Sequence, residues 1–211
     1  MERSPPARPS PAREKLLDAA VALIRTKGYA ATSVDELCAK AGVSKGAFFH
    51  HFDGKEALGV AAAEYWSKKT GAFFAAARYH KHKDPLERVL GYIDFRKAML
   101  RGEVPEFTCL AGTLVQEIYE TSPAIRKACD AAISAHAAEL EADIAEAIRH
   151  HGIRAGWPPR SLALYTQAVL QGAFILAKAK GDAAVAAECI DHLRRYLGLL
   201  FHSSNRRRKE I

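Results

Sequence analysis

Hydrophobic residues recur at helical spacing along almost the whole chain, and no segment alternates between apolar and polar residues for long. The first example is the apolar face formed by Leu16, Leu17, Ala20, Leu23 and Ile24. Residues three and four apart lie on one side of an α-helix, so this spacing indicates a helix with one buried face. The same spacing throughout predicts an all-α fold.

Start and stop signals divide this pattern into nine expected helices. Ser10-Pro11 is a favourable helix start, and both Thr32 with Asp35 and Ser33 with Glu36 have the pattern of a capping box. Glycines 28 and 181 follow apolar runs, where glycine often ends a helix. The expected helices span about residues 11–27, 33–41, 44–52, 55–79, 84–101, 107–120, 123–151, 160–180 and 182–202.

The second and third of these helices are separated by the tight turn Ala41-Gly42-Val43. Helix, short turn with glycine, and short helix is the layout of a helix-turn-helix DNA-reading unit. The third helix, which Ser44 is expected to cap, begins with Lys45-Gly46-Ala47, where small residues allow the backbone to approach bases in the major groove. Phe48 and Phe52 lie four residues apart and are expected to face the core of the module. A helical hairpin inside an ordinary globular domain has the same layout, so the pattern alone leaves both interpretations open.

The residues of this region resemble the TetR (tetracycline-repressor) family. The similarity runs in register over about residues 12–60, and includes Lys27-Gly28-Tyr29, the segment from Ala41 to Phe52, and Lys55-Glu56-Ala57-Leu58. It implies an N-terminal three-helix DNA-binding module and a larger helical domain that binds a ligand and dimerises. By this resemblance the chain is divided into a DNA-binding domain at 1–54 with a flexible arm, an effector-binding and dimerisation domain at 55–204, and a basic tail at 205–211.

The resemblance also implies a set of DNA contacts. Thr32 and Ser33 are expected at phosphate, the start of the third helix at base edges, and Phe49, His50 and Lys55 along the DNA backbone. Phe49 stands where the family most often has tyrosine, which removes a hydroxyl that binds phosphate. The full expected set is Thr32, Ser33, Ser44, Lys45, Gly46, Ala47, Phe49, His50 and Lys55.

The last two expected helices are strongly apolar, and the helix at 160–180 is hydrophobic nearly all round. A helix of this kind needs cover on two sides. In the TetR family the equivalent pair forms a four-helix bundle with a second copy, which predicts a homodimer through residues 160–180 and 182–202. A dimer with two recognition helices implies a palindromic operator in double-stranded DNA. The alternative is that both helices belong to the core of a monomer.

The effector pocket is expected among the middle helices, where aromatic walls and a few polar groups are needed. An aromatic residue at helical spacing is also the normal content of a core, so each assignment has that alternative. The candidate residues are Trp66, Phe73, Tyr92, Phe95, Phe107, Cys109, Gln116, Tyr119, Gln171 and Lys178.

Cys109 precedes a predicted helix start, where the helix dipole lowers the pKa of a thiol. The segment Cys109 to Glu117 resembles a branch of the family that senses reactive electrophiles and oxidants, and an inward-pointing Lys178 would stabilise a thiolate. The alternative is an inert buried cysteine. Cys38, where the family has a small alanine, is expected to fill the core.

Composition adds less than the motifs do. The net charge of +7 and the pI of about 9.3 suit a polyanionic partner without identifying one. No two of the four cysteines have zinc-site spacing, and the histidine pairs 50/51, 80/82 and 150/151 are explained without a metal, so neither metal nor cofactor is expected. The first residues are proline-rich and not apolar, which excludes a signal peptide there and predicts a bacterial cytoplasmic protein.

Together these features predict a repressor that leaves its operator when a small-molecule effector binds. Two other classes stay open: an all-α enzyme with Cys109 as nucleophile, and a constitutive DNA-packaging protein. The effector, the operator, the regulated genes and the direction of regulation are not encoded in any motif of the chain.

Overall fold

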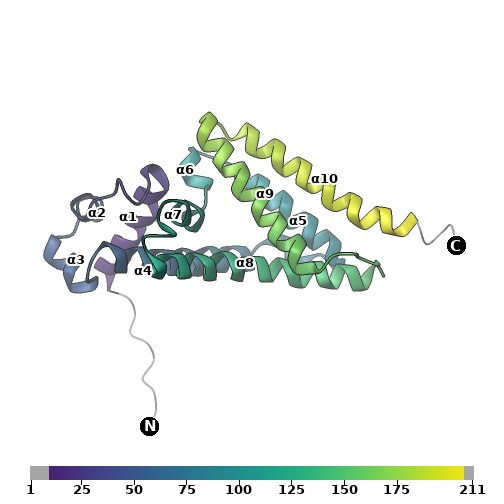
Figure 1. Cartoon of the computed structure of the whole chain (residues 1–211), viewed down its shortest axis with the longest axis horizontal. Helices are drawn as coiled ribbons and strands as arrows, with labels where there is room; N and C mark the ends of the chain where they lie inside the picture. Colours follow the sequence, from purple (N-terminus) through teal and green to yellow (C-terminus); the bar gives the residue numbers. More distant parts are fainter. Residues whose placement is uncertain (1–9, 207–211) are drawn as a thin grey trace, which may run out of the picture. The chain divides into compact units, whose positions relative to one another are not determined.

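The computed structural model describes residues 10–206, with side chains as far as residue 201, and over this range the protein is all helical (Figure 1). The elements are α1 (Pro11–Lys27), α2 (Val34–Ala41), α3 (Lys45–His51), α4 (Lys55–Ala75), the 3₁₀ helix η1 (Arg78–Lys81), α5 (Pro85–Ala98), α6 (Val104–Phe107), α7 (Leu110–Ile118), α8 (Pro123–His150), α9 (Pro159–Lys180) and α10 (Ala184–Arg206). The predicted all-α fold is confirmed. The arm at residues 1–9 and the tail beyond residue 206 lie outside the described residues.

The expected number of nine helices is wrong, because the described chain has ten α-helices and one 3₁₀ helix. The added α-helix is α6, a single turn in the segment that was expected to form a loop before one helix at 107–120. Pro105 lies in its first turn, and the Glu106 carboxylate accepts a hydrogen bond from the Glu103 N–H at 2.8 Å. Thr108 then has an extended backbone, with ψ of 161°, so α7 begins as a separate helix.

The described chain forms two compact units. The first unit contains residues up to Ser67 together with Leu110–Cys129, and the second contains Lys68–Cys109 and the chain from Asp130 onward. The chain therefore passes between the units three times: inside α4, at the start of α7, and inside α8. The first unit thus consists of α1, α2 and α3 with the beginning of α4, α7 and the beginning of α8.

The first unit is built on the apolar face that the sequence predicted for α1. Leu16, Leu17 and Ile24 of α1 are at most 2% exposed, as are Leu37 of α2 and Phe48 of α3. Each such side chain contributes about 1.5–3 kcal/mol by leaving water. Helices α2 and α3 are too short to be stable alone, so this shared core holds them in place.

The second unit has its core between α5, α8, α9 and α10, where α10 packs against both α9 and α5. Its helices are also joined by ion pairs, such as Lys97 of α5 with Asp191 of α10 at 2.7 Å. Within residues 10–206 one helix, α9, is long and apolar enough to cross a membrane by length and composition alone, and 44% of its most apolar window is buried in the structure.

Candidate DNA-binding site and effector site

The start of α2 is fixed by a capping box. The Ser33 hydroxyl accepts the Glu36 N–H at 3.2 Å, and the Glu36 carboxylate accepts the Ser33 N–H at 2.9 Å. The Lys27 ammonium also donates to Glu36. The hydrogen bonds from Lys27 and Ser33 lower the pKa of Glu36 to about 2, so this cap stays ionised at any physiological pH.

Thr32 and Ser33 have different environments although the sequence assigned both to phosphate. Thr32 is 1% exposed, and its hydroxyl donates to the Gly28 carbonyl at 2.7 Å. Ser33 is exposed. The Thr32 side chain therefore closes the turn after α1, whereas Ser33 stands at the surface where the N-terminus of α2 presents its N–H groups.

Helix α3 divides into a buried side and an exposed side. Phe48 is 0% exposed and the following Phe52 is 4% exposed, as the four-residue spacing predicted. Ser44 caps the helix by accepting the Ala47 N–H at 3.1 Å. The other expected DNA-contacting residues of this helix are exposed or, for Ala47, half-buried: Ser44, Lys45, Gly46, Ala47, Phe49 and His50.

Gly46 has no structural reason to be glycine. It has no positive φ, and a Cβ added to it would meet nothing closer than the Ser44 hydroxyl at 3.8 Å. A residue in the exposed first turn of a helix is stabilised by having a side chain, since glycine costs about 1 kcal/mol relative to alanine. The fold itself therefore does not require a glycine at position 46.

Two lysines flank this exposed surface. Lys45 pairs with Asp35 of α2 at 2.7 Å, and both side chains are more than half exposed. An exposed ion pair of this kind contributes little to stability, so the lysine is available to a phosphate. Lys55 donates to the Ala30 carbonyl at 3.3 Å and lies over the Tyr29 ring at 4.3 Å, and burial lowers its pKa.

Glu117 of α7 holds the turn between α1 and α2. One carboxylate oxygen accepts the Tyr29 N–H at 3.1 Å and the other accepts the Ala30 N–H at 3.0 Å. Gly28 has φ of +91°, and a Cβ there would lie 2.5 Å from the Glu117 carboxylate. The carboxylate thus fits over a glycine and holds the turn that connects α1 to α2.

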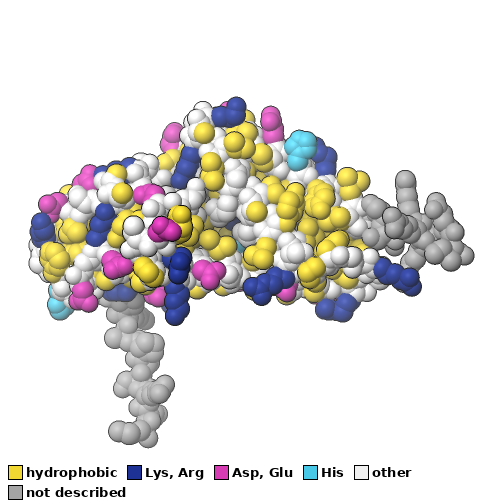
Figure 2. Space-filling model, viewed as in Figure 1, with side chains coloured by type: hydrophobic (Ala, Val, Ile, Leu, Met, Phe, Trp, Pro, Cys, Tyr) yellow, Lys and Arg dark blue, Asp and Glu magenta, His cyan; other side chains and the backbone are white. Residues whose placement is uncertain are grey.

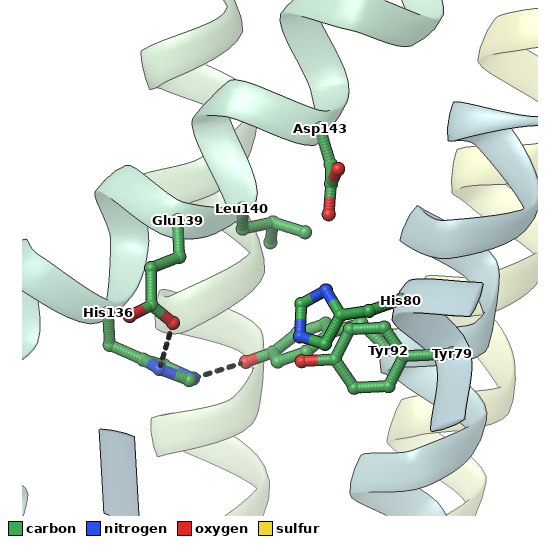
Figure 3. A pocket seen from close by; sticks show the side chains of 7 residues that line it. All are labelled: Tyr79, His80, Tyr92, His136, Glu139, Leu140 and Asp143. Atoms are coloured by element: carbon green, nitrogen blue, oxygen red, sulfur yellow. Dashed lines mark hydrogen bonds and ion pairs between the residues drawn. The ribbon is translucent and has the colours of Figure 1, made fainter. Parts of the chain in front are cut away.

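A buried chain of hydrogen bonds crosses the second unit. The Gln167 amide donates to the Tyr92 hydroxyl at 3.2 Å, so that hydroxyl donates its own proton to Nε2 of His136 at 2.9 Å. His136 then carries its proton on Nδ1, which lies 3.9 Å from the Glu139 carboxylate (Figure 3). The chain joins α9, α5 and α8.

The imidazole in this chain is neutral. Burial, with a contribution from the positive Arg96, lowers the pKa of His136 to about 4. A neutral ring is what the Tyr92 hydroxyl requires of its acceptor, so the 3.9 Å contact with Glu139 is not an ion pair at neutral pH. Burial likewise raises the pKa of Tyr79, whose ring lines the same pocket.

This pocket is lined by Tyr79, His80, Tyr92, His136, Glu139, Leu140 and Asp143, with the polar side chains directed into the space between η1, α5 and α8 (Figure 3). Its free space of about 10 Å³ has room for roughly one water molecule. A larger molecule would enter only after the surrounding side chains moved.

Arg96 lies beside this network between two aromatic rings. Its guanidinium carbon is 5.3 Å from the centre of the Phe74 ring and 5.4 Å from that of Phe174. No carboxylate among the described residues pairs with it. Arg96 is half-buried, so its charge is available to a group that enters this part of the core.

The structure places only part of the expected effector residues together. Tyr92 and Phe95 belong to the main core of the second unit, and Phe107 packs against Phe174 of α9 in a smaller cluster. Trp66, Gln116 and Tyr119 belong to the first unit. There Trp66 lies 4.6 Å from the Arg25 guanidinium, and the exposed Gln116 donates to Gly112 of its own helix.

The remaining candidates lie at the edge of the second unit. Phe73 is 51% exposed, Gln171 is half-buried, and Lys178 is exposed, so Lys178 does not point into the core. Cys109 is half-buried beside the Phe107 cluster and immediately precedes α7, as predicted. Cys38 is 6% exposed, which confirms its role as core filler.

Sequence reasoning missed Gln167, His136 and Arg96. Gln167 had a detectable signal, because it is a polar residue on the buried stripe that includes Ala163, Leu170 and Phe174. His136 and Arg96 had none, since their neighbours come from other helices.

Helices α9 and α10 share an exposed apolar face, and Figure 2 shows hydrophobic side chains gathered over them. The Tyr165 and Tyr196 rings, 5.3 Å apart, join the two helices into one continuous surface. An added Cβ at Gly172 or Gly198 would meet nothing. We call this surface the α9–α10 face; its exposed members are Leu164, Tyr165, Ile175, Leu176, Tyr196 and Leu199.

Comparison with known proteins identifies the class to which this arrangement belongs. Residues 16–62 match the sequence profile of bacterial regulatory proteins of the TetR family, and residues 85–193 match that of the tetracycline repressor-like C-terminal domain. A three-helix reader followed by a helical regulatory part defines a helix-turn-helix transcription regulator. The chain belongs to the TetR family of these regulators.

Individual relatives agree with the family profiles. The regulator YerO of Bacillus subtilis (strain 168) is 43% identical over 54 residues, which are 26% of this chain and 19% of YerO, so the chain spans about a fifth of that relative. The repressor DhaR of Mycobacterium sp. (strain GP1) is 24% identical over 80% of this chain and 83% of DhaR. The reduced form of NemR from E. coli superposes with a TM-score of 0.74, at 24% identity, over 87% of this chain and 96% of NemR; at that identity it shows the shared fold.

Proposed function

We propose that the protein is a repressor that binds a palindromic operator as a dimer and leaves it when a small-molecule effector binds the second unit. The observation that carries this proposal is the exposed start of α3, where an ion-paired lysine adjoins a glycine that the fold does not require. Lys45 supplies a charge for phosphate or a guanine edge, and Gly46 allows the helix to enter the major groove.

The proposed reading head consists of the N-termini of α2 and α3 with Lys55. Ser33 and the N–H groups of α2 bind one phosphate, and Lys55 binds another along the backbone. Of the residues expected from sequence, Thr32 contributes through its backbone, since its hydroxyl is occupied by Gly28. Phe49, 53% exposed, contributes apolar contact rather than a hydrogen bond.

The α9–α10 face is the proposed dimer interface. It is continuous, apolar and includes two glycines that permit close approach of a second helix pair. TetR-family regulators bind DNA as dimers and respond to small-molecule effectors, which supports this assignment. Two heads related by a two-fold axis read inverted half-sites about one DNA turn apart.

The proposed effector site lies in the second unit around the Gln167–Tyr92–His136 chain, with Phe95 and Phe107 as apolar walls and Arg96 facing the polar part of the effector. The present space admits about one water molecule, so binding requires this core to open. Because α4 and α8 each continue from one unit into the other, and the chain crosses again directly before α7, opening the core displaces the segments that carry the reading head. Effector and operator then weaken each other's binding by linkage.

A selection of duplexes from random DNA, followed by footprinting on the bacterial chromosome, tests the function. We expect the wild type to protect two inverted half-sites and Lys45→Ala to protect neither. Lys68→Ala, which removes an exposed lysine of the second unit, is the control and should protect both half-sites. Binding without any sequence preference would instead identify a DNA-packaging protein. Turnover of an electrophile that is lost in Cys109→Ser would favour the enzyme class.

The role of Cys109 stays a prediction with two alternatives: a thiol that senses electrophiles or an inert thiol in the core. Its half-buried place directly before α7 supports access from solvent. Thiol labelling near neutral pH, compared between the parent and Cys109→Ser, separates them. Equal labelling rates identify an inert residue. We also propose a bacterial cytoplasmic location, which membership of a DNA-binding family supports.

A further inference from the structure

Three side chains of types that can ligate a metal ion come together at one end of the second unit. Asp84 precedes α5, and His150 and His151 lie at the end of α8. One donor atom from each of the three side chains lies within 4.8 Å of the others. The sequence showed only an adjacent histidine pair, which is weak; the fold adds a carboxylate from 66 residues earlier in the chain.

The carboxylate is already held in position. Asp84 caps α5, and its Oδ1 accepts the Leu86 N–H at 2.8 Å and lies 2.8 Å from Nε2 of His151. No hydrogen bond to its other oxygen, Oδ2, occurs among the described residues. Carboxylates fixed by a second hydrogen bond are the usual support of a metal site, because the ligand need not be ordered when the ion binds.

The end of α8 is equally well defined. Gly152 has φ of +61°, and the His151 N–H donates to the Ala147 carbonyl at 3.0 Å. The last carbonyls of a helix carry a partial negative charge, which favours a cation at this end. His150 is exposed, and its ring lies 5.0 Å from that of His151, so neither burial nor distance prevents both rings from facing one ion.

We propose that Asp84, His150 and His151 form a binding site for a divalent transition-metal ion, with zinc as the best fit. Two imidazoles and one carboxylate are a donor set that zinc, nickel and copper prefer over magnesium or calcium. Bonds of about 2.0–2.1 Å in a tetrahedral site place donors roughly 3.3 Å apart. The observed separations of 2.8 to 4.8 Å reach this value by rotation of the exposed His150 ring and a small opening of the Asp84–His151 contact.

The ion completes its shell with water and joins the beginning of α5 to the end of α8. The site is independent of the effector core: none of its three residues lines the pocket around His136. Binding to the folded chain alone raises the melting temperature by about 5 °C or more when free zinc exceeds the Kd a hundredfold.

The test uses the full-length, tag-free protein after removal of metal with a chelator. Zinc alone is titrated in competition with a chromophoric chelator, with magnesium as the negative control. We expect one zinc ion per chain, and an affinity at least tenfold lower in His150→Ala and in Asp84→Asn, which keeps an oxygen for the helix cap. His192→Ala removes an exposed histidine of α10 and is expected to change nothing.

Cobalt substitution tests whether the cysteines, rather than the proposed site, bind the metal ion. We expect d–d absorption without a thiolate-to-cobalt charge-transfer band. The proposal is overturned by a wild-type affinity equal to that of His150→Ala, by an unchanged affinity in Asp84→Asn, or by a thiolate band that disappears with the cysteines. Unchanged melting temperature in saturating zinc also overturns it.

Discussion

The two units build their candidate sites from interactions of very different range. In the first unit, the caps of α2 and α3 join residues three apart in the sequence, as Ser33 with Glu36 and Ser44 with Ala47. In the second unit, the buried hydrogen bonds of Tyr92 join residues 44 and 75 positions apart. The helix starts of the proposed reading head are therefore specified locally, with Glu117 as a long-range addition, whereas the proposed effector core exists only through tertiary packing.

The difference has a functional consequence. An exposed surface held by caps and ion pairs changes little when a ligand approaches, because its groups are already solvated. A buried polar chain is stable only while every member has its partner, so a ligand that replaces one partner rearranges several helices. This contrast supports the proposed division of roles, in which the reading head recognises DNA without rearranging and the second unit switches.

The largest expected effect concerns the α9–α10 face. Ile175→Glu places a charge in the centre of the proposed interface, where it would be buried without a partner. We expect a monomer by analytical ultracentrifugation and a loss of operator affinity of about 10³-fold or more, since one head alone approaches non-specific binding. Phe73→Glu, at 51% exposure outside these helices, is the control and should remain dimeric. A dimeric Ile175→Glu protein would exclude this face as the interface.

The next effect is the pH dependence of stability from His136. Its pKa is about 4 in the folded chain and about 6.5 when unfolded, so between these values the unfolded chain binds more protons. The stabilisation is complete above pH 6.5 and is lost as the pH falls toward 4, by about 3 kcal/mol. Urea unfolding at several pH values measures it. His136→Gln, which does not titrate, should show a shallower decline over that window, and an identical decline would contradict the assignment.

The same contrast of range determines what the sequence could predict. The caps, the buried Phe48 and Phe52, and the exposed start of α3 follow from residues within four positions of each other, and all were predicted. The division of the effector candidates between the two units was not predicted, because Gln116 in α7 and Tyr119 directly after it belong to the first unit. His136 pairs with residues of another helix, and no local pattern indicates that. The short α6 was missed because one helical turn has no measurable periodicity.

Gly46 tests whether the reader is shaped by DNA rather than by its own fold. Gly46→Leu meets no atom of the protein within 3.4 Å at its Cβ, so folding stability should stay equal or rise by up to about 1 kcal/mol. Operator affinity should fall about 100-fold, because both heads of a dimer lose a close groove contact of roughly 1–3 kcal/mol. Gly54→Ala, which also meets nothing, is the control on the same unit. Unchanged operator binding by Gly46→Leu would show that the start of α3 does not enter the DNA groove.

The smallest expected effect concerns the contact of Glu117 with the turn after α1. Glu117→Ala leaves the Tyr29 and Ala30 N–H groups without their carboxylate acceptor. Because this turn is exposed, water replaces the carboxylate, and we expect a loss of about 1–2 kcal/mol in the stability of the first unit. Gly28→Ala should cost more, through its φ of +91° and its clash with the carboxylate.

The double variant Gly28→Ala/Glu117→Ala separates these two costs. It removes the clash and keeps the backbone strain, so its loss should be smaller than the sum of the single losses. Additive losses would mean that the carboxylate does not lie over Gly28. Because Glu117 belongs to α7, which follows Cys109 directly, the same variants measured for operator affinity report how firmly α7 positions the reading helices.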